Sequence, residues 1–126
     1  MIGYNAIKGE SVMLTDKAGM DRIISEYIKK VKEILADDFE RAVVYGSYAR
    51  GEYNSESDVD IAIFTSRKAE EFYLLINQIA EITFEYGVQY DIILSPVFQN
   101  TADFQRMLKV MPYFQNIQRE GIVVGA

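Results

Sequence analysis

The sequence contains no cysteine and no histidine among its 126 residues. Without cysteine there can be no disulfide framework and no thiolate metal site, so a cytoplasmic location is expected. Without histidine, both the commonest general base and the commonest zinc ligand are missing. Any metal would therefore be held by oxygen ligands, which favours Mg²⁺, Mn²⁺ or Ca²⁺.

The sequence also lacks long apolar runs and an excess of positive charge. No run approaches the ~18 residues needed to cross a bilayer, and residues 1–10 lack the charged and apolar regions of a signal peptide. The net charge of −6 argues against direct binding of a long nucleic acid, because phosphate backbones are bound mainly by basic patches. We expect a single domain over residues 1–126, without membrane contact, in which residues 1–14 form an N-terminal extension outside the main pattern.

The spacing of the apolar residues predicts alternating helices and strands. Helices are expected over about residues 17–36, 67–86 and 101–111, the second capped by Ser66 and stopped by Gly87, the third followed by a break at Pro112 and a short helical turn. Strands are expected at residues 41–45, 59–64, 90–94 and 121–124. This order predicts an α+β domain with the helices gathered on one face of a small sheet.

Three aspartates fall at the starts of predicted strands. Asp58 and Asp60 are two residues apart, so both side chains leave the same face of the sheet. At an effective dielectric of ~20, such a pair costs roughly 3–4 kcal/mol, and a divalent cation would remove that cost. Asp91 would join them on that face if the two strands are neighbours, and three carboxylates there would form a two-metal site for in-line transfer. Taken singly, each aspartate also fits a solvated surface position.

A glycine-rich segment precedes this acidic pair. Residues 46–51, GSYARG, have the glycine spacing of a P-loop, but Glu52 and Tyr53 stand where lysine and serine or threonine are required. An EF-hand at residues 54–60 is excluded because Val59 occupies the position of the turning glycine. What remains is a strand, a Gly-Ser pair and a short helix, whose N–H groups and hydroxyl are suited to holding a phosphate.

Together these residues resemble a known family. Gly46-Ser47, ten intervening residues and Asp58-Val59-Asp60 match the Gly-Ser-x10-Asp-x-Asp signature of nucleotidyltransferases related to DNA polymerase beta. The fuller strings GSYARG and SDVD resemble the minimal nucleotidyltransferases (MNT proteins), many of which are antitoxins of HEPN–MNT toxin–antitoxin pairs. The resemblance covers most of the chain except residues 1–14. It implies the nucleotidyltransferase fold, similar to the palm of DNA polymerase beta, with a small mixed sheet.

The resemblance also implies roles for the site residues. Gly46 and Ser47 would bind the β- and γ-phosphates of ATP, and Asp58 and Asp60 would hold Mg²⁺, with two ions expected. Asp91 would complete the metal site and help to deprotonate the attacking hydroxyl.

The remaining polar residues of the segment allow more than one interpretation. Arg50 either contacts phosphate or forms an ion pair with a nearby carboxylate that fixes the loop. Ser57 is expected to shape the entry to the strand, and Tyr45 or Tyr48 to lie near the base.

The function implied is Mg²⁺-dependent transfer of AMP from ATP onto a tyrosine of a HEPN-type RNase toxin, which makes the chain an antitoxin. One alternative is an antitoxin that neutralises its partner by binding alone. A second is a subunit of a small-molecule, antibiotic-type nucleotidyltransferase. A third, the Asp-x-Asp of a sugar-nucleotide glycosyltransferase, is disfavoured because such domains are usually longer and do not require Gly46-Ser47.

Overall fold

The computed structural model describes residues 17–52 and 58–124. The helices are α2 (Lys17–Leu35), α3 (Gly46–Ala49), α4 (Tyr73–Tyr90), α5 (Thr101–Met107) and α6 (Pro112–Glu120), with 3-10 turns η1 (Ala36–Asp38) and η2 (Ala69–Glu71). The strands are β1 (Phe39–Tyr45), β2 (Asp58–Thr65), β3 (Ile93–Asn100) and β4 (Ile122–Val124). The expected extension at residues 1–14 and the role assigned to Ser57 lie outside the described residues. Within the described ranges, no helix is both long enough and apolar enough to cross a membrane.

The four strands form one mixed sheet in the order β3-β2-β1-β4. Strand β1 runs antiparallel to β2 and β4, whereas β2 and β3 are parallel. The register pairs Tyr45 with Asp60 across β1 and β2, and pairs Asp58 with Ile93 and Asp60 with Ser95 across β2 and β3. The α+β class with a small mixed sheet is therefore confirmed.

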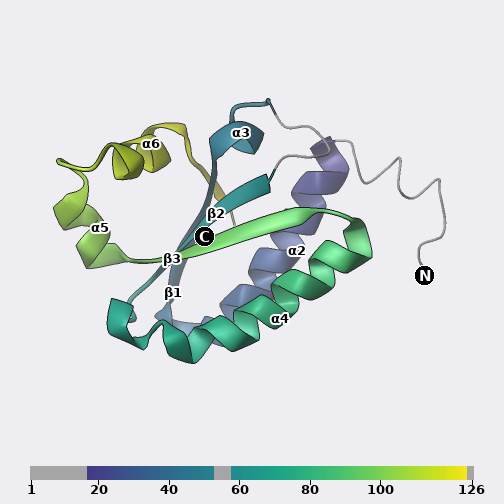
Figure 1. Cartoon of the computed structure of the whole chain (residues 1–126), viewed down its shortest axis with the longest axis horizontal. Coiled ribbons are helices and arrows are strands. Elements are labelled where there is room, and N and C mark those ends of the chain that lie inside the picture. The colour runs from purple at the N-terminus through teal and green to yellow at the C-terminus, as the bar shows by residue number, and fades with distance from the viewer. Residues whose placement is uncertain (1–16, 53–57, 125–126) are drawn as a thin grey trace.

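The main core lies between the sheet and the two long helices, α2 and α4 (Figure 1). Helix α2 ends within one residue of its predicted limit, and its apolar stripe is buried. Val59, Ile61 and Ile63 alternate along β2 and point into this core, as the period of a strand requires. The Tyr27 hydroxyl joins α2 to α4 through a 2.7 Å hydrogen bond to Thr83 Oγ1.

A smaller core covers the opposite face of the sheet. Phe104 of α5 and Ile117 of α6 pack there against Val43, Ala62 and Phe64. Figure 1 shows α5 and α6 away from α2 and α4. The expectation that the helices gather on one face thus holds for the two long helices only, and the C-terminal helices cover the other face.

The largest differences from the predicted elements lie around α4 and β3. The helix begins at Tyr73 and continues through Gly87 to Tyr90, and Ser66 is not its cap. It continues because Tyr86 and Tyr90 pack together at the core, with ring centroids 5.7 Å apart. Gly87 serves a close approach instead, since a Cβ there would lie 3.1 Å from the Ile92 carbonyl oxygen.

Strand β3 consequently begins later than predicted and runs through Ser95 and Pro96, which were expected to end it. Proline is tolerated because β3 is an edge strand, where a missing N–H leaves no ladder partner unsatisfied. Near the C-terminus, Pro112 begins α6 at its first turn, a position that proline favours, and α5 ends at Met107. The last strand, β4, is confirmed.

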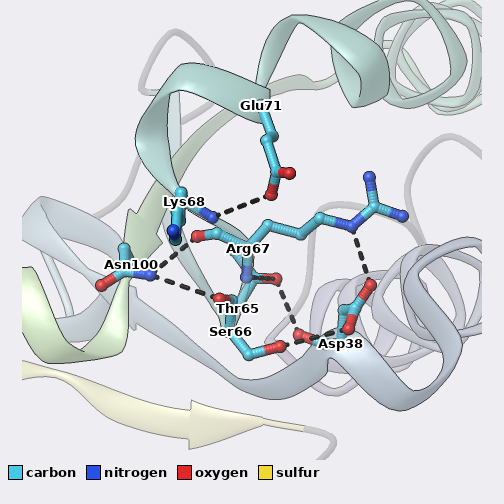
Figure 2. A network of polar contacts seen from close by, with 7 residues as sticks. All are labelled: Asp38, Thr65, Ser66, Arg67, Lys68, Glu71 and Asn100. Atoms are coloured by element: carbon cyan, nitrogen blue, oxygen red, sulfur yellow. Dashed lines mark hydrogen bonds and ion pairs between the residues drawn. The ribbon is translucent and has the colours of Figure 1, made fainter.

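A polar network fixes the end of the sheet where β2 and β3 terminate (Figure 2). The Asp38 carboxylate accepts a 2.7 Å hydrogen bond from Arg67 Nε, and its backbone carbonyl accepts one from the Thr65 hydroxyl. Asn100 donates to the Arg67 carbonyl at 2.8 Å and caps α5 by accepting from the Asp103 N–H. This polar network lies at the Thr65 end of β2. Asp58 and Asp60 are at the other end of the strand and take no part in it.

Candidate active site

The site begins at Gly46, where β1 passes into the short helix α3. Gly46 has a φ of +77°, a left-handed conformation that glycine adopts without strain. A Cβ at this position would lie 2.4 Å from Asp60 Oδ2. The backbone turn and the carboxylate of β2 are thus in direct contact, and only glycine fits between them.

Asp58 is the first residue of β2 and Asp60 is the third. They alternate with Val59 and Ile61, which point into the main core, so both carboxylates share the opposite face, as predicted. That α5 and α6 cover this face was not predicted. The pKa of Asp60 is raised, first by burial and then by the negative charge of Asp58. The repulsion expected from the spacing is therefore present.

Ser95 of β3 is a member of the site that the sequence interpretation missed. Its hydroxyl donates to Asp58 Oδ2 at 3.3 Å, and its backbone is paired with Asp60. The residue looked like the end of a strand because proline follows it. Only the parallel register of β2 and β3 places it beside the carboxylates.

Asp91 is not on a strand, contrary to the prediction. It ends α4 in a left-handed conformation, with a φ of 56°, two residues before β3 begins, and its side chain is exposed. Within residues 17–52 and 58–124, no three histidine, cysteine, aspartate or glutamate side chains lie close enough together to hold a metal ion. The structure therefore does not bring Asp91 into one cluster with Asp58 and Asp60.

Arg50 forms ion pairs with carboxylates, which is one of the two roles that the sequence allowed for it. Its Nε lies 3.1 Å from Glu52 Oε1 and its Nη1 lies 3.1 Å from Glu120 Oε1, so it links α3 to the end of α6. The charge of Arg50 also lowers the pKa of Asp60, partly offsetting the effect of Asp58. Glu120 is far away in the sequence, and no local pattern identifies it as a partner.

Of the two tyrosines expected near the base, only Tyr45 lies beside the carboxylates. Tyr45 is paired with Asp60, and its hydroxyl lies 2.7 Å from that of Tyr113 on α6, with the rings edge to face. Burial is the main cause of the raised pKa of Tyr45. Tyr48, the other tyrosine expected near the base, is buried in the main core, and its hydroxyl donates to Asp21 of α2.

The oxygen donors of this site suit a magnesium ion that brings most of its other ligands with it. Asp58, Asp60 and Ser95 supply hard oxygen donors, and a cation would offset both burial and the Asp58 charge, the two causes that raise the pKa of Asp60. Mg²⁺ is usually bound by one or two carboxylates, with substrate phosphates and water completing its shell. The residues fit that arrangement and not an all-protein metal cage.

The family model described as "Nucleotidyltransferase domain" matches residues 25–117, which include Gly46, Ser47, Asp58 and Asp60. The chain belongs to the nucleotidyltransferase domain family. This nucleotidyltransferase is also similar to two proteins of Methanocaldococcus jannaschii, each named "Putative protein adenylyltransferase". One is 40% identical over 75 residues, covering 60% of this chain and 74% of the relative. The other is 25% identical over 104 residues, covering 82% of this chain and 96% of the relative.

A solved structure has the same fold. The crystal structure of a "putative nucleotidyltransferase" from Sulfolobus solfataricus aligns with a TM-score of 0.57 and 15% identity, covering 98% of this chain and 90% of that chain. The nucleotidyltransferase fold and an enzyme of the nucleotidyltransferase class are therefore established for this chain.

Proposed function

We propose that this nucleotidyltransferase transfers AMP from ATP onto a tyrosine hydroxyl of a HEPN-type RNase toxin and so acts as its antitoxin. The observation that carries the proposal is the direct contact between the Gly46 backbone and the Asp60 carboxylate, with Asp58 on the same face. This contact supports the proposal, because nucleotidyl transfer requires a phosphate-binding turn next to metal-binding oxygens, and the Gly46 turn and the two carboxylates would serve these roles.

The nucleotide is proposed to bind over α3. Gly46 has no side chain to obstruct the phosphates, and the Ser47 hydroxyl with the backbone N–H groups of this turn would hold the β- and γ-phosphates. Asp58 and Asp60 would hold Mg²⁺, which supplies positive charge to the phosphates and to the departing pyrophosphate. Arg50 orders this turn through Glu52 and Glu120, and it need not contact phosphate.

In the proposed transfer the acceptor tyrosine oxygen attacks the α-phosphorus of ATP. The bond from that phosphorus to the bridging oxygen breaks, and pyrophosphate leaves with the electron pair. The tyrosine proton passes to a carboxylate, and we propose Asp91 for this role. Asp91 is exposed near the end of the sheet at which β2 and β3 begin, two residues before Ile93, which is paired with Asp58. An incoming protein can approach it there.

A protein acceptor is supported by the names of the relatives. The two from Methanocaldococcus jannaschii are each named "Putative protein adenylyltransferase". The HEPN toxin as acceptor rests on the resemblance of GSYARG and SDVD to the minimal nucleotidyltransferases.

A double variant, Asp58→Asn with Asp60→Asn, distinguishes neutralisation by AMP transfer from the alternative of neutralisation by binding alone. Co-expressed with the toxin from an adjacent reading frame, the variant should bind the toxin but no longer protect the cells. Protection equal to that of the wild type would show that catalysis is not the mechanism. Transfer of AMP to an aminoglycoside, with none to the toxin, would instead favour the small-molecule alternative.

A further inference from the structure

Helix α4 carries apolar side chains on two of its faces. Leu75, Ile79 and Tyr86 are buried in the main core. A second row runs along the whole helix at spacings of three, four, four and four, and we call it the α4 stripe: Tyr73, Ile76, Ala80, Phe84 and Val88. Its members are exposed, Tyr73 by 68%, Phe84 by 71% and Val88 by 67%. A surface helix normally has one apolar stripe and a polar outer face, so a second stripe indicates a surface that another element covers.

A groove lies between this stripe and the edge strand β3. Its volume is about 510 Å³, and it is lined by Ile76, Ile79, Ala80, Thr83, Phe84, Pro96 and Phe98. The only side-chain hydroxyl in the lining, that of Thr83, is engaged with Tyr27 and with the Ile79 carbonyl, each at 2.7 Å. Small-molecule sites combine apolar walls with a few well-placed polar groups. This groove offers apolar walls only, which suits the side chains of a protein partner.

The charges around the stripe indicate what kind of protein fits. Glu81 and Glu85 are exposed on α4, and residues 73–90 contain no lysine or arginine. In the segment before the helix, Glu70 and Lys68 are both exposed, so the rim as a whole is acidic. A second copy of the chain, with a net charge of −6, would bring one acidic rim against another. A basic rim on the partner would instead be attracted.

We infer that the α4 stripe and its groove dock an amphipathic helix of a protein partner, whose apolar anchors recur at helical spacing and whose flanks carry lysine or arginine. The surface lies on the main-core side of the sheet, whereas Asp58 and Asp60 lie on the other face. Docking there leaves the nucleotide site open. The inference extends the proposed function by naming where a protein acceptor is held, yet the surface itself does not depend on catalysis.

The test is an NMR titration of the ¹⁵N-labelled full chain with a helical peptide of leucine and lysine, against a scrambled peptide of the same composition. Amide shifts should change along α4 and β3 with the helical peptide and not with the scrambled one. Ala80→Arg, which places bulk and positive charge in the stripe, should weaken binding at least about tenfold. Phe84→Gln should weaken it as well, and gives a second variant if the first perturbs the helix.

Val110→Arg is the matched control, because Val110 is 67% exposed and lies outside the stripe. It should leave the affinity unchanged, as should the Asp58→Asn, Asp60→Asn double variant, which separates this test from that of the proposed function. Equal binding of both peptides, or shifts that map elsewhere, would overturn the inference. So would a dimer in sedimentation that Ala80→Arg dissociates, or contacts in the peptide-free chain between the stripe and another segment of the same chain.

Discussion

At Gly46, the backbone conformation and the neighbouring side chain both require glycine. The residue is in the left-handed region, and its Cα faces the Asp60 carboxylate. Gly51 shares the first property, with a φ of +79°, but a Cβ there would meet nothing within 4 Å. A comparison of the two glycines therefore separates the free-energy cost of a side chain in the left-handed conformation from the cost of a clash with Asp60.

We predict that Gly46→Ala and Gly51→Ala differ in both stability and nucleotide affinity. Each should lose about 1–2 kcal/mol because an alanine is strained in the left-handed conformation. Gly46→Ala should lose more and should also abolish nucleotide binding, since its methyl group displaces Asp60. Urea unfolding and ATP titration measure the two effects. Equal losses in both variants would show that the contact with Asp60 is unimportant.

Asp60 carries a stability cost that its proposed role in holding a metal ion would explain. Because its pKa is raised in the folded state, the folded protein holds that proton more tightly than the unfolded chain does. Stability is therefore lost as the pH rises from the ordinary value of 3.8 through the raised value, and the ionised pair is unfavourable at neutral pH.

The second prediction is that Asp60→Asn raises the melting temperature at pH 7. The gain should disappear at a pH low enough to protonate Asp60 in the wild type. Thermal unfolding of both proteins over a range of pH values, without divalent cations, measures this. A variant that melts below the wild type at pH 7 would contradict the account of the site.

The third prediction concerns Asp91. Asparagine also tolerates the left-handed conformation, so Asp91→Asn should leave the melting temperature unchanged. If Asp91 accepts the tyrosine proton, the rate of transfer should fall by about 10²-fold or more while nucleotide affinity is kept. An unchanged rate would leave Asp91 with the role of a helix cap alone.

At the scale of elements, the long amphipathic segments were predictable and the junctions between elements were not. Helix α2 and strand β2 could be predicted from strong local periodicity. Because β2 was predicted, so was the shared face of Asp58 and Asp60. The start of β3 was misplaced because the packing of Tyr86 and Tyr90 extends α4 beyond its glycine. That packing is a tertiary effect that no local spacing contains.

The same reason explains the site residues that were missed. Ser95, Tyr113 and Glu120 reach the site from β3 and α6, and their positions depend on strand register and on which face the C-terminal helices cover. Gly46 and Asp60 were identified because the signature that links them lies within one short segment of the chain.

The fourth prediction tests how α2 is joined to α4. Thr83 donates its hydroxyl proton to the Ile79 carbonyl, so in the bond between the two hydroxyls Tyr27 is the donor. Burial raises the pKa of Tyr27 to about 12, so this hydroxyl stays protonated. Tyr27→Phe should lower the free energy of unfolding by about 1 kcal/mol through loss of this hydrogen bond. Tyr73→Phe, at a position 68% exposed, is the control and should change it by less than about 0.5 kcal/mol. If the two variants changed the free energy of unfolding equally in urea, the hydrogen bond between Tyr27 and Thr83 would make no contribution to stability.

At the scale of the whole molecule, the two faces of the sheet have different tasks. One face carries the acidic pair, with α6 held to α3 through Arg50. The other carries the main core, and beyond it the α4 stripe. The ion pair between Asp38 and Arg67 lies at the other end of the sheet from the acidic pair. The proposed nucleotide site and the proposed docking surface therefore lie on different faces of the sheet.

The most direct test of this account is the intact mass of the partner after reaction. The purified chain, ATP and Mg²⁺ are incubated with the proposed partner, a HEPN-type toxin that the chain binds, with the Asp58→Asn, Asp60→Asn variant as control. The account predicts an AMP-sized mass gain on a tyrosine of the partner with the wild type and none with the variant. A partner whose mass is unchanged by the wild type, although the two proteins bind each other, would contradict the proposed transfer.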